Sequence, residues 1–451
     1  MEVVCTITAW LLGFGLAVAF VPQAYADVNV GRWAVAWLCV ALLIWIIPSV
    51  RWSLAGSVLL VLALVSFAWA PEPLNAINGF LQIVLLAAAF VVGRAIGGRD
   101  VFEGAAWGMI VNSGLAVCQF LGWHPVMEVS TASPAGLFGN RDFMAEAALL
   151  VITPMVWQRR WAMGVALLPA LLLPMDRSVV VAGGAVVAVV TWRVSRMVTV
   201  TALSAVFVLV TAATLSVEKS RSAMDRYFLW TDTIQGLTVM GRGIGQFYNT
   251  FPEAATHQPL ERIRSDHAHN DWLELTYELG IVGIVLAGVL SFGVLSGPTG
   301  WEKSVFLALC VMSCFAFPLH NPATAVLGLV AAGGVYRRRD MECCGLAGSP
   351  MDCLFCAFER KADAWDSKRG QALSDQPVLS RGFGRMADAQ SNSSRSGNRG
   401  NQFLPAARSL FARCNTLTHE LRVAVGFARG SAGGRTDVAE DHACGSHCLS
   451  V

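Results

Sequence analysis

The segment SDHAHNDWLELTYELGIVGIVL, residues 265–286, changes character in its middle. Its first half holds two histidines, two aspartates, an asparagine and a glutamate, and its second half is almost entirely Gly, Ile, Val and Leu. Because about 20 apolar residues cross a bilayer as an α-helix, the second half predicts a membrane-spanning helix. The polar half then lies where that helix leaves the membrane.

Similar apolar runs recur along the chain of 451 residues. The sequence is 55% hydrophobic and only 14% charged, whereas soluble domains usually carry about 25% charged residues. We therefore expect an all-α, polytopic integral membrane protein with about twelve transmembrane helices. The expected spans lie near 5–22, 33–50, 54–71, 78–97, 102–121, 142–157, 161–174, 178–192, 197–215, 272–296, 303–318 and 322–336.

Basic residues alternate between the loops that join these spans. One set of loops carries Arg51, Arg94, Arg99, Arg159, Arg160, Arg193, Arg196, Lys303 and Arg337–Arg339, whereas the short loops of the other set carry only Arg32, Arg141 and Arg177. Positive residues stay on the cytoplasmic side, so both termini are expected there. Residues 1–336 form the expected membrane domain. No lysine- or arginine-rich face with interleaved aromatic residues occurs, so we expect no nucleic-acid partner.

A long external loop, residues 216–271, follows from this topology. Loops of such length in a compact domain are usually functional. Within the loop, RSAMDRYFLWTDTIQGLTVM (221–240) places Met224, Phe228, Leu229, Ile234 and Leu237 near helical spacing. The pattern fits a helix on the membrane surface and equally a helix that simply packs against the protein.

Residues 337–451 differ in composition from the rest of the chain. They are rich in Ser, Arg, Gly and Asn and predict a disordered cytoplasmic tail. Cys353-x-x-Cys356 and HACGSHC (442–448) leave a zinc site as the alternative. The cysteines of the apolar runs behave as small hydrophobic residues, and no disulfide framework is expected.

The polar half of the opening segment predicts the start of a helix. Asp271 is a good N-cap, and Glu274 follows at the capping-box spacing, so His269 and Asn270 lie just outside the N-terminus. The positive end of the helix dipole favours a bound anion there and keeps a nearby imidazole neutral. Gly280 and Gly283 allow another helix to approach closely.

Three arginines on the external side are candidates for the same site: Arg141, Arg177 and Arg226. A guanidinium stays charged and binds phosphate oxygens in a fork. For Arg141 we favour interfacial snorkelling, and for Arg177 a functional role. A neutral histidine beside arginines suits transfer from a lipid-linked pyrophosphate, whose leaving group needs charge neutralisation while the acceptor hydroxyl needs a base. No metal is required.

The same residues resemble the O-antigen ligase-like superfamily. Its motif is His-[Asn/Ser/Gln], nine residues, Gly, two residues, [Gly/Thr/Tyr], and His269-Asn270, Gly280 and Gly283 match it completely. Further similar segments follow in the family's order: GLFGNRDFMAEAALL (136–150), DRSVVVAGG (176–184), RYFLWTDTIQGLTVMGRGIGQF (226–247) and FAFPLHNPATAVLGLVAAG (315–333). Asp176 stands where Ser is common and Ser178 where Gly is common. The resemblance covers roughly residues 60–336.

The resemblance implies a bacterial inner-membrane enzyme with its site facing the periplasm. The donor would be an undecaprenyl-pyrophosphate glycan, His269 the base, and Arg177 and Arg226 the pyrophosphate ligands, without metal or cofactor. Supporting roles are expected for Asn140, Arg141, His267, Asn270 and Glu274. The leading expectation for the acceptor is lipid A–core, which would make the reaction O-antigen ligation, and the alternatives are a protein such as pilin and a growing polymer.

Two alternatives of other classes remain. A transporter or flippase would want polar groups near mid-bilayer, whereas here they cluster at the outer face. A metal site would use His267 and His269 with Asp266 and Asp271, and it needs further ligands in good geometry. His257 is the other nearby histidine.

Overall fold

The computed structural model describes residues 2–21, 29–47, 54–124, 134–174, 176–192, 200, 204, 217–257 and 265–347. The chain divides into two units, Met1–Gln371 and Ala372–Val451. Every described residue belongs to the first unit, and the fold given below is the fold of that unit.

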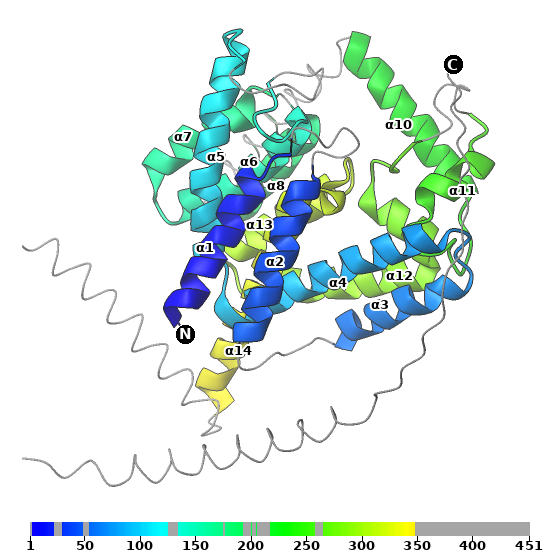
Figure 1. Ribbon diagram of the computed structural model, residues 1–451, viewed down its shortest axis with the longest axis horizontal. Helices are drawn as coiled ribbons and strands as arrows, with labels where there is room; N and C mark the ends of the chain where they lie inside the picture. Colours follow the sequence, from blue (N-terminus) through cyan, green and yellow to red (C-terminus); the bar gives the residue numbers. More distant parts are fainter. Residues whose placement is uncertain are drawn as a thin grey trace, which may run out of the picture. The chain divides into compact units, whose positions relative to one another are not determined.

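The described residues form helices and no strand, so the all-helical class predicted from the sequence is confirmed for them (Figure 1). The α-helices are α1 (Glu2–Val18), α2 (Val30–Ile46), α3 (Leu54–Val65), α4 (Pro73–Ile96), α5 (Arg99–Phe120), α6 (Arg141–Trp157), α7 (Trp161–Leu172), α8 (Arg177–Trp192), α10 (Val217–Gln235), α11 (Phe247–Ala254), α12 (Asp271–Leu295), α13 (Trp301–Met312) and α14 (Pro322–Ala347). Two 3₁₀ turns, η1 (Ser66–Ala68) and η3 (Pro318–His320), complete the set.

A helix occupies eleven of the twelve predicted spans, and the twelfth, 197–215, lies almost wholly outside the described residues. Helices α4, α5 and α12 are long and apolar enough to cross a membrane, and shorter apolar helices accompany them. The chain is therefore a membrane protein by its helices. The number of crossings, their direction and the periplasmic position of the long loop stay predictions.

The helices pack through small residues, as expected where lipid removes the hydrophobic drive between helices. A Cβ at Gly13 of α1 would collide with the carbonyl oxygen of Val101 on α5. Similarly, a Cβ at Gly93 of α4 would collide with the carbonyl oxygen of Val330 on α14. These two helix pairs approach closely because neither glycine has a side chain.

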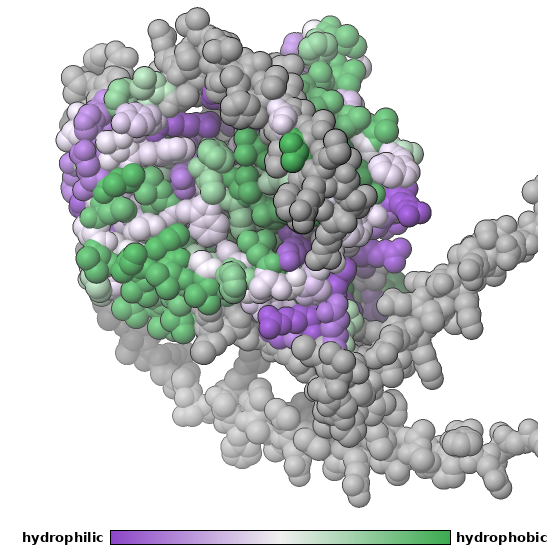
Figure 2. Space-filling view, turned by 180° about the vertical axis from the view of Figure 1, so that it is seen from behind, coloured by the Kyte–Doolittle hydropathy of each residue, from purple (hydrophilic) through white to green (hydrophobic). Residues whose placement is uncertain are grey.

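The outer surface is broadly apolar. Figure 2 shows wide hydrophobic areas, with hydrophilic residues gathered in patches between them and toward the edges. Large side chains such as Trp45 and Phe292 are 84% and 74% exposed. An exposed apolar surface of this extent is expected of a chain surrounded by lipid rather than water.

Helix α14 continues past residue 336, where the membrane domain was predicted to end. Arg338 forms a two-oxygen ion pair with Glu302 at 2.7 and 2.8 Å, and Asp340 pairs with Arg94 at 2.9 Å. These pairs hold the additional turns of α14 against its neighbours. Residues 348–451, which contain both cysteine clusters considered above, lie outside the described residues.

The amphipathic stretch of the long loop is helical, as predicted, and forms α10. Its apolar residues do not form one buried stripe, because Leu229 is buried whereas Met224 and Ile234 are 54% and 57% exposed. Leu229 packs with residues of α11 and α12, including Phe247 and Tyr277. One face of α10 is therefore a packing face.

Candidate functional site

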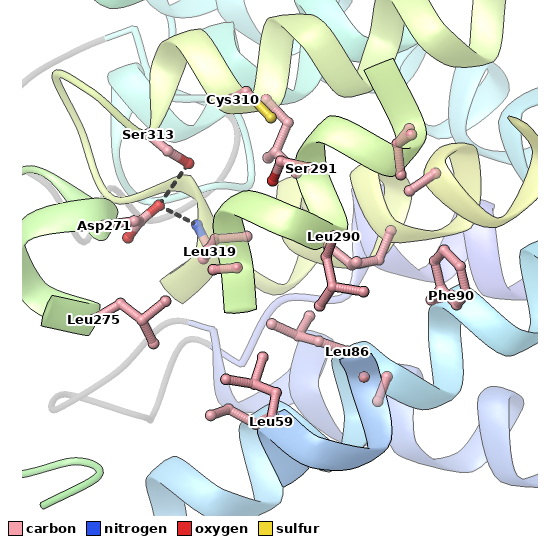
Figure 3. Close-up of a pocket in the computed structure, with 18 of the residues that line it drawn as sticks. Leu59, Leu86, Phe90, Asp271, Leu275, Leu290, Ser291, Cys310, Ser313 and Leu319 are labelled. Atoms are coloured by element: carbon pink, nitrogen blue, oxygen red, sulfur yellow. Dashed lines mark hydrogen bonds between the residues drawn. The ribbon is translucent and has the colours of Figure 1, made fainter. Parts of the chain in front are cut away.

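Helix α12 begins one residue earlier than predicted. Its N-cap is Asn270, whose Oδ1 accepts a hydrogen bond from the backbone N–H of Leu273 at 3.0 Å. The expected N-cap, Asp271, is instead the first helical residue. Its Oδ2 accepts hydrogen bonds from Ser313 Oγ (2.9 Å) and the Leu319 N–H (3.1 Å), as Figure 3 shows. The expectation for Asp271 was wrong because another segment of the chain uses its carboxylate.

These bonds attach the start of α12 to the segment 313–321. The Asn270 side-chain amide donates to the carbonyl of Cys314 at 3.0 Å, and the Asp271 N–H donates to the carbonyl of Ser313 at 2.9 Å. Residues more than 40 positions apart in sequence therefore form one rigid corner, and His269 lies at this corner.

His269 has a left-handed backbone, with φ of 51°. Such angles are uncommon outside glycine and are enriched at functional sites. Its ring forms a T-shaped contact with Phe317, with 4.8 Å between ring centroids. The pKa of His269 is lowered to about 4, chiefly by burial and also by the electrostatic effects of Arg226 and His267, against the opposing effect of Glu274. The imidazole is thus neutral at neutral pH, as predicted, but burial is the leading cause.

Arg226 of α10 lies within electrostatic range of both His269 and Arg177. Its guanidinium donates to the carbonyl of Phe315 at 2.8 Å, two residues from the ring that touches His269. Its charge acts on His269 and on Arg177. The structure therefore brings the predicted base and the two predicted pyrophosphate ligands into one electrostatic neighbourhood.

Arg177 is the first residue of α8, and its position depends on a local cap. Asp176 accepts hydrogen bonds from the Ser178 N–H at 3.0 Å and from the Ser178 hydroxyl at 2.6 Å. Asp176 and Ser178 are the two positions where the sequence departs from the family pattern. Together they form an N-terminal cap that fixes the turn carrying Arg177.

Asn140 and Arg141 begin α6 near this group. Asn140 is the N-cap, and its Oδ1 accepts from the Asp142 N–H at 2.8 Å. Arg141 is 40% exposed at its side chain and lies 3.8 Å from Asp142. This placement gives Asn140 a structural role and leaves Arg141 at the rim. Sequence reasoning missed Glu146 of the same helix, a buried carboxylate within electrostatic range of Arg226 and Asp176.

A second polar group, which includes His267, also contacts Phe317. Glu274, only 4% exposed at its side chain, bonds His267 Nδ1 at 3.0 Å and His320 Nε2 at 3.2 Å, and accepts from the Ala268 N–H at 2.8 Å. The ring of His267 stacks on Phe317 at 4.8 Å and lies 4.0 Å from the ring of His320. We call His267, Glu274 and His320 the carboxylate–imidazole cluster.

His320 is the member of this cluster that sequence reasoning did not single out. Burial alone would lower its pKa, but the carboxylates of Glu274 and Asp271 outweigh burial and raise the pKa to about 9. The segment FAFPLHNP was noted for its likeness to the family, yet nothing in it marks His320 as a neighbour of Glu274. Their contact exists because η3 turns back onto the start of α12.

The metal alternative keeps His267 from the set considered in the sequence but joins it to Glu274 and His320 rather than to His269, Asp266 and Asp271. His257 is bound to Asp232 at 2.6 Å, and His269 contacts Phe317 rather than the carboxylates. Within the described chain, the ligand atoms of the carboxylate–imidazole cluster lie within 4.8 Å of one another and form the group with metal-ligand spacing. In that cluster, one Glu274 oxygen already bonds both imidazoles.

Gly280 does not serve the helix contact expected of it. Its φ of 67° and ψ of −165° break the helical conformation inside α12. A Cβ there would collide with the Val239 carbonyl, so a loop rather than a helix approaches. That loop is fixed by bonds from the Arg242 and Gly243 N–H groups to the carbonyls of Tyr277 and Glu278, both 2.9 Å. At Gly283, the nearest neighbour is Leu279 of the same helix. The expected helix packing was therefore wrong at Gly280, and at Gly283 it stays a prediction.

Two cavities adjoin at the start of α12. A polar chamber of about 720 Å³ is lined in part by the carboxylate–imidazole cluster and by residues of α2 and α4. An apolar slot of about 190 Å³ lies beside it, between α3, α4, α12, α13 and α14 (Figure 3). Asp271 and Leu319 line both. A hydrocarbon-lined space thus meets a polar space at the corner that positions His269.

Residues 143–288 match the family model described as O-antigen ligase. The match confirms the resemblance to the O-antigen ligase-like superfamily. The O-antigen ligase segment runs from α6 into α12 and contains Arg177, Arg226 and His269. It supports glycan transfer in a membrane as the class of activity. No curated protein matches the chain.

Proposed function

We propose that this protein transfers a glycan from an undecaprenyl-pyrophosphate carrier to an acceptor hydroxyl at the periplasmic face of the inner membrane. The observation that carries the proposal is the partly buried imidazole of His269, whose pKa is lowered in part by Arg226, together with Arg177, on which Arg226 also acts electrostatically. A neutral base within electrostatic range of a permanent cation, with a second cation in range of the first, suits a reaction in which a hydroxyl loses a proton and an anion departs.

The proposed reaction requires only the lipid-linked donor, the acceptor and the protein. His269 accepts the proton of the acceptor hydroxyl as its oxygen attacks the anomeric carbon of the donor sugar. The bond from that carbon to the pyrophosphate oxygen breaks, and undecaprenyl pyrophosphate leaves with the electron pair. Arg177 and Arg226 bind the phosphate oxygens and stabilise the negative charge that develops on them.

The residues around His269 fix its position and provide a space for the lipid part of the donor. His269 is partly buried, and its left-handed backbone is held by the Asn270 and Asp271 bonds to segment 313–321. The apolar slot offers hydrocarbon walls to part of a prenyl chain. These features support a lipid-linked donor over a soluble nucleotide sugar, which would have no use for a membrane slot.

We propose ligation of O-antigen to lipid A–core as the reaction. Transfer to a protein such as pilin, and polymerisation of repeat units, use the same donor and the same base. The acceptor is what separates them. Deleting the gene and comparing lipopolysaccharide and pilin on gels distinguishes the three: a lost ladder over intact lipid A–core indicates ligation, single-repeat addition indicates polymerisation, and a pilin shift indicates a protein acceptor.

The test of the site is a histidine comparison. His269→Ala is expected to lower transfer by roughly 10²–10⁴-fold, the contribution of a positioned base, with normal membrane insertion. His257→Ala is the matched control, because His257 is 43% exposed and bonds Asp232 rather than any residue of the proposed site. Transfer is measured with purified protein, lipid-linked donor and acceptor. Wild-type transfer by His269→Ala would eliminate His269 as the base.

A further inference from the structure

The polar chamber is not used by the proposed chemistry, because His269 is not among the residues that line it. Its volume of about 720 Å³ lies within the range of small-molecule sites, about 300–1,000 Å³. It is therefore large enough for part of a substrate, and its walls indicate which part.

One wall carries three amides of α4: Asn75, Asn78 and Gln82. They recur at i, i+3 and i+7, so they lie on one face of the helix. Polar side chains in a helix long and apolar enough to span a membrane are costly and usually functional. Gln82 is already oriented, since it donates to the Leu319 carbonyl at 2.7 Å. An amide both donates and accepts hydrogen bonds, which matches the double capacity of a hydroxyl group.

A second wall is aromatic. Trp33 and Trp37 of α2 are four residues apart on one face of the helix, and Tyr248 of α11 joins them. Flat aromatic faces provide large apolar contact with a polar edge. The carbon–hydrogen faces of a sugar ring can pack against such a surface, while the hydroxyls around the ring can form hydrogen bonds with the amides of α4.

The charge of the chamber excludes phosphate. Among its described lining residues none is Lys or Arg, whereas Asp266, Asp271, Glu274 and Glu278 contribute carboxyl groups. The imidazoles of His267 and His320 already bond Glu274. Arg177 and Arg226, the candidate pyrophosphate ligands, do not line the chamber, so an uncharged group suits it.

We propose that the polar chamber binds uncharged sugar units of a glycan that flank the reacting sugar. The inference rests on the proposed glycan transfer and deepens it. Phe317 joins the two places, because His267 of the chamber stacks on its ring and His269 forms a T-shaped contact with it, both with 4.8 Å between ring centroids. A glycan seated in the chamber thus ends one aromatic ring away from the base.

The glycan belongs either to the donor or to the acceptor, and two probes separate these sources. The first probe is the neutral oligosaccharide released by mild acid from the organism's own lipid-linked donor. The second is its deacylated core oligosaccharide, with and without phosphates. Binding to the purified full-length protein is measured by saturation-transfer NMR and by tryptophan fluorescence.

We expect at least one probe to bind, and removal of phosphates from the core not to weaken it. Asn78→Ala should weaken binding roughly three- to tenfold, the value of one neutral hydrogen bond. Trp37→Leu should weaken it about tenfold. Trp45→Leu is the matched control, because Trp45 lies on the same helix, is 84% exposed and does not line the chamber.

Transfer kinetics then assign the source. A raised KM for the acceptor with an unchanged KM for the donor places acceptor sugars in the chamber, and the reverse places donor sugars there. Absence of binding by both probes, a requirement for phosphate, or equal effects of Trp37→Leu and Trp45→Leu would overturn the proposal. The proposed function fails separately, through retained transfer in His269→Ala.

Discussion

The pH profile of transfer tests the environment of His269. The base must be unprotonated to act, and burial, with Arg226 and His267, lowers its pKa from 6.5 to about 4. The rate constant kcat/KM reports the ionisation of the free enzyme. We therefore expect its acidic limb to fall to half at a pH of about 4.

The expected difference in kcat/KM is large enough for a simple assay. At pH 5.5, a base with a pKa of about 4 is roughly 97% unprotonated, whereas one with the ordinary pKa of 6.5 is only about 9% unprotonated. The wild-type protein should thus keep nearly its full kcat/KM at pH 5.5, about ten times more than an exposed histidine would allow. Initial rates of transfer between pH 4 and 8, in detergent and at constant ionic strength, provide the curve.

Arg226→Gln tests how much of the lowered pKa of His269 is due to the charge of Arg226. Removing that cation should move the acidic limb upward from about pH 4, but not to 6.5, since burial contributes most and remains. The variant will be slower overall because Arg226 also belongs to the proposed pyrophosphate site, so each curve is normalised to its own plateau. His257→Ala should leave the limb in place.

The thermal stability of the protein must be measured over the same pH range. Because the folded pKa of His269 lies below its unfolded value, the unfolded chain binds this proton first, and the free energy of unfolding decreases as pH falls from about 6.5 toward 4. Thermal unfolding at each pH separates this loss from loss of the base. An acidic limb centred near 6.5 in a fully folded protein would refute the placement of His269 as a buried base.

The remaining predictions concern Arg226, the pair Glu274 and His320, Gly280, and metal removal. Arg226→Lys should lower transfer by roughly 10²-fold or more, because an ammonium does not replace a forked guanidinium; near-normal kcat/KM would remove Arg226 from the site. Glu274→Gln should destabilise the protein by about 3–5 kcal/mol in thermal unfolding. The wild-type protein should lose stability as pH rises from about 6.5 through about 9, because His320 has a raised pKa, and Glu274→Gln should remove most of that dependence. Gly280→Ala should destabilise by about 1–3 kcal/mol since its φ is 67°, whereas Gly288→Ala, in open space on the same helix, should not. EDTA should leave transfer unchanged, and strong inhibition would direct attention to the carboxylate–imidazole cluster as a metal site.

Helix positions were accessible from the sequence because apolar runs are a local property. The existence of α12 and its start within one residue follow from the change of composition at residue 271. Asn270 and Asp271 are equally good caps by residue type. What decides between them is Ser313 and Leu319, which engage Asp271 from a distant segment, and no local pattern contains that information.

The misassignment of Gly280 has the same origin. Two glycines at close spacing in an apolar run are typical of helix packing, and in this chain Gly13 and Gly93 do pack helices. Gly280 differs in its backbone angles, which admit the loop containing Val239. Spacing records only that side chains are small. It does not record which backbone conformation the missing side chain permits.

Phe317 and His320 show which part of the site could not be predicted from the sequence. They lie about 50 residues after His269 in a short 3₁₀ segment, and neither residue type at that position indicates chemistry. Yet Phe317 contacts both His267 and His269, and His320 pairs with the carboxylate of Glu274. The predicted base was found from a motif, whereas its surroundings depend on how η3 folds back.

The two proposals assign different charges to two groups of residues near Phe317. Arg226 acts electrostatically on His269 and Arg177, whereas the polar chamber is lined by carboxyl groups and by no described Lys or Arg. A glycosyl pyrophosphate has a matching polarity, with anionic phosphate at one end and uncharged sugars at the other. The bond that must break joins these two parts, and the new bond forms at the same carbon. A base that contacts the same ring as His267 of the chamber and lies within electrostatic range of Arg226 is therefore placed where the reacting carbon belongs, whichever substrate supplies the sugars in the chamber.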